Sequence, residues 1–251
     1  MRNKFVVKRL TIARKLARQL KREYGRNITA IGIIGSVARE KAGQYSDIDL
    51  EIIVRKATPE SYQSRIIENT YCSLTFVTRR SVIQEITRPV PDLPERLGGY
   101  TRIRPIYDPA GFLRTLEAKA RHVPPRVFRR SAELALLHSY EDFCRVKNAY
   151  LDHDEGLLRD NANYVTHSAS LIVASLNNAY FVSDREIFKA YKRFNRLPRG
   201  FTRINDIRYG HLKPKKLLET TMALYLDVIE FCSNEGIQFP VDQEYLRSLT
   251  M

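Results

Sequence analysis

Apolar residues recur along this chain with two different periods, and the change from one period to the other divides it. Residues 5–24 place apolar side chains along one stripe at helical spacing, which predicts an amphipathic helix that ends at Gly25. An apolar run at residues 30–34 predicts a buried strand, residues 46–54 predict a second strand, and the alternation over residues 70–78 predicts a third. The first part of the chain is therefore expected to contain a sheet.

The segments between and after these strands give weaker patterns. We expect a helix or loop over residues 59–68, a short helix over 81–87 and another strand over 100–107. The prolines at positions 89, 91 and 94 favour irregular structure. Asp108-Pro109 predicts the start of a helix, with Asp108 as its cap and Pro109 in its first turn.

Alternation typical of strands nearly disappears after Pro124-Pro125. Helical patterns follow over residues 126–151, 161–179, 184–194 and 214–234. A part rich in strands followed by a part with helices only predicts an α+β fold in two domains, residues 1–123 and 124–251.

The candidate chemistry lies at the first two predicted strands. Gly35-Ser36 directly follows the first strand, where Gly35 permits close approach to the backbone and Ser36 offers a hydroxyl at a helix start that suits a phosphate. Asp47, Asp49 and Glu51 occupy every second position, so they share one strand face. Oxygen ligands of this kind suit Mg²⁺ that bridges to substrate phosphates. Gly-Ser alone is only a turn and Asp-Ile-Asp alone is usually a solvated strand edge, but their combination favours a functional site.

Charge adds a second candidate activity. The 251-residue chain has a formal net charge of +14, and residues 1–26 contain ten Lys or Arg and one acid, Glu23. Such a segment is most often a solvated helix face, and it also suits nucleic acid.

We expect no membrane span, because no apolar run is long enough. The absence of a signal-peptide pattern and three scattered cysteines favour the cytoplasm.

The order of these motifs carries a family resemblance. The block from Gly35-Ser36 to Ser46-Asp47-Ile48-Asp49 resembles the nucleotidyltransferase superfamily that includes DNA polymerase beta. Landmarks over both halves resemble the kanamycin nucleotidyltransferase (aminoglycoside 4'-O-nucleotidyltransferase) family: Ala30-Ile31-Gly32, Pro105-Ile106-Tyr107-Asp108, Glu141 with Arg145 and Asn148, and Leu197-Pro198-Arg199-Gly200-Phe201. The resemblance implies an N-terminal nucleotidyltransferase domain with a mixed sheet flanked by helices, a C-terminal helical bundle domain, and a homodimer.

The resemblance also implies roles for individual residues. Ser36 would bind the triphosphate of an NTP, and ATP is the expected nucleotide. Asp47 and Asp49 would ligate Mg²⁺. Glu141 would be the general base that takes the proton of the acceptor hydroxyl. The other residues expected to bind the nucleotide are Gly35, Arg39, Ser46 and Arg145, and Arg145 replaces a lysine of the family. The family's third acid corresponds to Ser73, a poor metal ligand, which leaves open a weaker metal site or the use of Glu51.

These expectations support one main function and two alternatives. The main one is Mg²⁺-dependent transfer of a nucleoside monophosphate from an NTP to an acceptor hydroxyl, with release of pyrophosphate and with an aminoglycoside-type antibiotic as the family's acceptor. A polycationic acceptor is repelled at long range by a protein of charge +14 unless its groove is locally acidic. The alternatives are a nucleotide-binding protein without catalysis and a nucleic-acid-binding module that uses the basic first helix.

Overall fold

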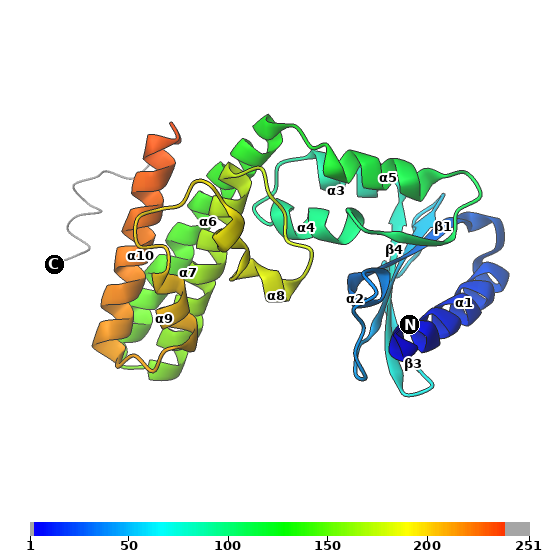
Figure 1. Cartoon of the computed structure of the whole chain (residues 1–251), viewed down its shortest axis with the longest axis horizontal. Coiled ribbons are helices and arrows are strands. Elements are labelled where there is room, and N and C mark those ends of the chain that lie inside the picture. The colour runs from blue at the N-terminus through cyan, green and yellow to red at the C-terminus, as the bar shows by residue number, and fades with distance from the viewer. Residues whose placement is uncertain (1–2, 239–251) are drawn as a thin grey trace. The chain divides into compact units, whose positions relative to one another are not determined.

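The structure is a computed structural model that describes residues 3–238. Residues 1–2 and 239–251, which belong to the two predicted domains, lie outside the described residues. The described chain forms two compact units (Figure 1). The first unit contains residues up to 88 together with 95–123, and the second contains residues 89–94 together with those from 124 onward. No helix of the described residues is long and apolar enough to cross a membrane.

The first element of the first unit is helix α1, Lys4–Tyr24, which confirms the predicted amphipathic helix. The Asn3 side chain accepts a hydrogen bond from the Phe5 N–H at its start, and Gly25 ends it with a φ of 54°. The short 3-10 helix η1, Gly25–Asn27, leads into the sheet. The apolar stripe of α1 packs on one face of this sheet, in a core shared with alternate residues of the central strands, including Ile48, Leu50 and Leu74.

The sheet has five strands in the order β3-β4-β2-β1-β5. Their bounds are β1 Ile28–Ile34, β2 Ile48–Val54, β3 Tyr62–Ile67, β4 Thr70–Thr78 and β5 Arg104–Tyr107. Only the β2–β4 pair is parallel, so the sheet is mixed, as the resemblance implied. Because α1 covers the face of Ile48 and Leu50, the acids Asp49 and Glu51 point to the opposite face.

Four further helices complete the first half of the chain. They are α2 Gly35–Ala38, α3 Arg79–Thr87, α4 Leu93–Tyr100 and α5 Phe112–Arg121. The face that carries the acids is covered at β1 by Ile103 and by Leu113 of α5, which approach Gly32 so closely that a Cβ there would lie 2.5 Å from Ile103 Cδ1. Gly32 therefore lets this layer pack directly on the backbone of β1.

Four local predictions were wrong. Residues 62–67 form strand β3 rather than a helix or loop. The strand predicted over 100–107 contains only Arg104–Tyr107, because Tyr100 belongs to α4. Helix α5 starts at Phe112, so Pro109 lies outside it, although Asp108 still accepts hydrogen bonds from the first two N–H groups. The helix predicted over 184–194 is broken into α8 Asp184–Ile187 and the 3-10 helix η2 Ala190–Arg193.

The described residues of the second unit form helices joined by loops and contain no strand. Its long helices are α6 Pro125–Leu151, α7 Glu155–Leu176 and α10 Pro214–Asn234, with the shorter α9 Arg203–Tyr209 packed against α7 and α10. They enclose one apolar core, in which the rings of Phe143 and Tyr225 stack with centroids 4.4 Å apart. These helices confirm the predicted C-terminal bundle.

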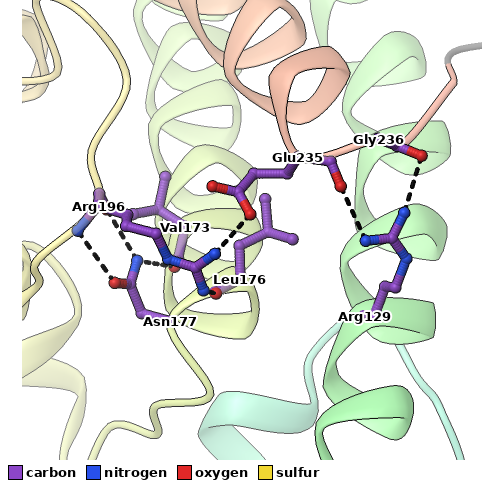
Figure 2. A network of polar contacts seen from close by, with 7 residues as sticks. All are labelled: Arg129, Val173, Leu176, Asn177, Arg196, Glu235 and Gly236. Atoms are coloured by element: carbon purple, nitrogen blue, oxygen red, sulfur yellow. Dashed lines mark hydrogen bonds and ion pairs between the residues drawn. The ribbon is translucent and has the colours of Figure 1, made fainter.

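Polar contacts join the ends of the bundle helices (Figure 2). Arg129 donates to the main-chain oxygens of Glu235 and Gly236, both at 2.8 Å, and so ties the start of α6 to the end of α10. Arg196 donates to the Glu235 carboxylate and to the Leu176 carbonyl, and its own backbone is bonded to Asn177. Because these groups satisfy the carbonyls left open at helix ends, the network stabilises the bundle rather than forming a ligand site.

Candidate active site

The turn after β1 forms the first part of the site. Gly35 has a φ of +70°, and a Cβ at this position would lie 2.4 Å from Asp49 Oδ2. This position therefore requires glycine both for its backbone conformation and for the approach of Asp49. The next residue, Ser36, has a buried hydroxyl oxygen with no hydrogen-bond partner. Because buried polar groups are nearly always paired, this hydroxyl is suited to a ligand. Arg39, directly after α2, is half-buried.

The acids form the second part of the site. Asp49 pairs in register with Ile34 on one side and with Ser73 on the other, and the Ser73 hydroxyl donates to Asp49 Oδ1 at 2.9 Å. Asp47 is exposed and lies just before β2. The pKa of the Tyr62 hydroxyl is raised by its hydrogen bond with Tyr71 and further by the charges of Asp49 and Asp47. Both carboxylates are thus close enough to act on the same exposed tyrosine.

Glu51 shares the face of Asp49 but lies in a different environment. Its side chain is only 3% exposed, and the Tyr100 O–H donates to Glu51 Oε1 at 3.0 Å. The pKa of Glu51 is raised to about 8, mainly because the side chain is buried. The hydrogen bond from Tyr100 lowers this pKa, and the nearby charge of Glu85 raises it further. A carboxyl that is buried and favours its protonated form binds a cation less readily than an exposed carboxylate, which disfavours Glu51 as a substitute for the acid at the position of Ser73.

The donor set can nevertheless accommodate a divalent ion that arrives with a nucleotide. Among the described residues, no group of three or more His, Cys, Asp or Glu side chains is arranged to hold a metal. Mg²⁺ is commonly bound by one or two carboxylates together with substrate phosphates, and Asp47 and Asp49 fit this pattern. The unpaired Ser36 hydroxyl, next to the Gly35 approach to Asp49, is consistent with phosphate at this place.

A buried arginine that sequence reasoning missed holds the loop before Asp47. Arg9 of α1 is 4% exposed, and its guanidinium donates to the carbonyls of Gln44 and Ser46, both at 2.6 Å. The Ser46 hydroxyl accepts a hydrogen bond from the Gly43 N–H at 2.8 Å and so stabilises the same loop. The signal available in the sequence was helical spacing, because Arg9 stands three, four and seven residues before Ile12, Ala13 and Leu16 of the apolar stripe.

The residues predicted in the helical half lie together on α6. Arg145 Nη2 is 2.6 Å from Glu141 Oε1, and both side chains are more than half exposed. Next to them, Asp142 accepts a hydrogen bond from the Ser168 hydroxyl of α7 at 2.7 Å. Glu141 is thus accessible to solvent and hydrogen-bonded, whereas Gly35, Ser36 and Asp49 form a separate group in the first unit.

Comparisons with known proteins assign a family model to each half of the chain. Residues 13–99 match the family model of the nucleotidyltransferase domain, and residues 110–238, more than half of the chain, match that of the KNTase C-terminal domain. Two proteins named aminoglycoside nucleotidyltransferase (4'), from Staphylococcus aureus and a Bacillus species, are 20% identical over 231 residues, which is 91% of this chain and 91% of theirs.

A solved structure has the same fold. It is the nucleotidyltransferase-like protein from Exiguobacterium sibiricum, with a TM-score of 0.55 at 12% identity, covering 89% of this chain and 75% of that one. Both halves of the present chain match their family models in the order that the motifs predicted. The chain therefore belongs to the kanamycin nucleotidyltransferase-like family, and it is a nucleotidyltransferase with a KNTase C-terminal domain.

Proposed function

We propose that this protein transfers a nucleoside monophosphate from an NTP, with ATP as the expected nucleotide, to a hydroxyl of a small acceptor. The observation that carries the proposal is the buried, unpaired Ser36 hydroxyl beside the point where Gly35 admits the Asp49 carboxylate. In this proposal Ser36 donates to a phosphate oxygen of the nucleotide. Arg39 adds positive charge near the end of α2. Asp47 and Asp49 hold Mg²⁺, which when bound offsets negative charge on the phosphates.

The reaction needs one proton acceptor. The acceptor oxygen attacks the α-phosphorus, its O–H bond breaks, and Glu141 takes the proton. A new O–P bond forms as the bond from the α-phosphorus to the bridging oxygen breaks, and pyrophosphate leaves. In this proposal Arg145, which donates a hydrogen bond to Glu141, orients that carboxylate and offers a planar donor to phosphate oxygens.

Two observations bear on the class of the acceptor. The names of the 20% identical relatives suggest an aminoglycoside. The outer face of β3 and β4 beside Asp49, however, carries Tyr62, Ser64, Tyr71 and Ser73, which are all neutral. Because carboxylates are the groups that attract a polycation, we include neutral hydroxyl compounds, such as uncharged glycosides, among the candidate acceptors.

The direct test is an acceptor screen with the four NTPs and Mg²⁺, read by pyrophosphate release and by the mass of the product. We expect a product heavier than its acceptor by one nucleoside monophosphate. The matched variant is Asp49→Asn, which keeps the size of the side chain and removes its charge. Turnover by Asp49→Asn at the wild-type rate would contradict the metal assignment.

A nucleotide-binding role without catalysis is the second candidate. It is favoured by one observation, namely that the Ser73 hydroxyl, at the position of the family's third acid, occupies an oxygen of Asp49. Calorimetry with ATP and Mg²⁺ separates the two candidates. Binding without pyrophosphate release from any acceptor supports the second, whereas absence of both binding and release contradicts both.

We further propose that the protein acts as a homodimer. Mixing the inactive variants Asp49→Asn and Glu141→Gln tests whether the two residues can act from different chains. Partial recovery of turnover on mixing, together with a dimer mass in light scattering at micromolar concentration, is the expected result. A single-chain mass would contradict the dimer.

A further inference from the structure

Helix α1 carries a row of cations on the side that faces away from the sheet. The buried residues of its apolar stripe pack on the sheet core, and the buried Arg9 binds the loop before Asp47. Figure 1 shows α1 beside the sheet. The exposed cations, which we call the α1 ridge, are Lys4, Lys8, Arg14, Lys15, Arg18 and Arg22. From Lys4 to Arg22 the ridge is about 27 Å long, at about 1.5 Å per helical residue.

Most of this charge is not neutralised within the protein. Lys15 pairs with Glu68 at 2.8 Å, and Glu23, the only acid of α1, pairs with Arg65 at 3.3 Å. Among the described residues, no carboxylate forms an ion pair with Arg14, Arg18 or Arg22. These three arginines stand four residues apart, and like charges at this spacing repel each other and destabilise the helix. An external polyanion would relieve this repulsion.

The structure extends the positive surface beyond the helix. The Asn27 side chain accepts a hydrogen bond from the Lys56 N–H at 2.9 Å and donates to the Lys56 carbonyl, and its backbone carbonyl accepts from Arg55 N–H. These bonds fix the exposed residues Arg55 and Lys56 next to the exposed Arg26, directly after the end of α1. The ridge thus continues onto a second segment that folding places beside it.

We propose that the α1 ridge binds the phosphodiester backbone of nucleic acid, an activity separate from nucleotidyl transfer. The rise between successive arginines is about 6 Å, close to two base-pair steps of a duplex, and the whole ridge spans about eight base pairs. An anionic membrane fits less well, because amphipathic helices bind lipid by inserting an apolar face and the apolar stripe of α1 is buried in the core. Val7, at 47% exposure, is the one large exposed hydrophobic residue of α1 among those described.

Binding is measured by fluorescence anisotropy with the full chain, a labelled 20-base-pair DNA duplex and a 20-nucleotide single-stranded RNA, between 50 and 200 mM salt. The test variant is Arg14→Gln/Arg18→Gln/Arg22→Gln, in which glutamine keeps a helix propensity close to that of arginine. The control is Arg102→Gln/Arg114→Gln/Lys119→Gln, which removes the same charge from exposed positions of the first unit. Neither variant alters a residue assigned to nucleotidyl transfer.

For the duplex, log K falls as log salt rises, with a slope of about −0.9 for each phosphate contact. Loss of three contacts in the ridge variant should make this slope less steep by about 2.7. The control is expected to keep the wild-type slope. If the triple variant does not fold, as judged by circular dichroism, Arg18→Gln alone should remove about 0.9. Equal weakening in the ridge and control variants would overturn the proposal, as would failure of the wild type to bind either nucleic acid at 50 mM salt. Binding to phosphatidylserine vesicles but to neither nucleic acid would overturn it too.

Discussion

Replacing Gly35 with alanine tests the contact on which the candidate site depends. The new methyl carbon would lie 2.4 Å from Asp49 Oδ2, well inside contact distance, and Gly35 already has a φ of +70°. The left-handed backbone costs about 1–2 kcal/mol for a residue with a Cβ. Movement of Asp49 would also disturb its hydrogen bond from Ser73, worth about 1 kcal/mol. The free energy of unfolding should therefore fall by roughly 2–3 kcal/mol.

Gly111→Ala is the matched control. Gly111 lies in the same unit with a φ of +66°, but an added Cβ would have no atom within 4 Å. This variant should lose only the backbone contribution of about 1–2 kcal/mol. Urea denaturation measures both losses, and calorimetry with ATP and Mg²⁺ measures binding. We expect Gly35→Ala to bind the nucleotide at least 10-fold more weakly, because a shift of Asp49 removes about 1.4 kcal/mol or more of interaction, and Gly111→Ala to bind as the wild type does.

The comparison between the two glycines makes the reasoning refutable. If folded Gly35→Ala binds ATP and Mg²⁺ as tightly as Gly111→Ala does, Asp49 does not need its present position, and the assignment of the metal site to this turn is wrong. If both variants lose binding equally, the loss reflects general destabilisation rather than displacement of Asp49.

Three further variants address the rest of the site. Glu141→Gln should lower kcat by about 10²–10⁴-fold in the pyrophosphate assay and leave ATP affinity unchanged, whereas an ordinary helix ion pair with Arg145 predicts unchanged turnover. Arg9→Lys should raise the KM for the nucleotide and lower the free energy of unfolding by about 1.5–3 kcal/mol, because an ammonium group cannot reproduce the guanidinium fork that spans two carbonyls. Tyr100→Phe should cost about 1–3 kcal/mol in urea denaturation, because the buried Glu51 carboxyl loses its donor.

For helices and strands with one buried face, the pattern of apolar residues predicted the type and position of the element correctly. Helix α1 and strand β4 have clear periods of 3.6 and 2, and the structure has them at residues 4–24 and 70–78. The predicted strand over 46–54 begins only at Ile48, since Ser46 takes part in the loop bonded to Gly43 and Arg9. The strand pattern alone could not indicate where this loop ends.

Strand β3 was missed because its polar side is the covered one. Gln63 donates to the Tyr24 hydroxyl at 3.0 Å and Arg65 pairs with Glu23, both on the side of α1. On the open side, Tyr62 and Ile66 are 53% and 78% exposed. In β3 the polar side chains are covered and the apolar ones are exposed, which is the opposite of an ordinary half-buried strand. Contacts with α1, which is distant in sequence, therefore determine that this segment is a strand. Helix α4 was missed for a simpler reason, since its proline lies in the first turn, where no N–H is needed.

The candidate site was predictable as a motif but not as an electrostatic arrangement. Asp47, Asp49 and Glu51 look equivalent in the sequence, yet Glu51 is buried against Tyr100 and favours its protonated form, while Ser73 supplies a hydroxyl where the family has an acid. Glu51 is therefore not equivalent to the other two acids, and Ser73 adds no carboxylate to this face. Two carboxylates bind Mg²⁺ adequately only when phosphate oxygens complete its coordination. If Asp47 and Asp49 hold the ion, as we propose, the nucleotide supplies the remaining ligands, and metal binding is then coupled to nucleotide binding.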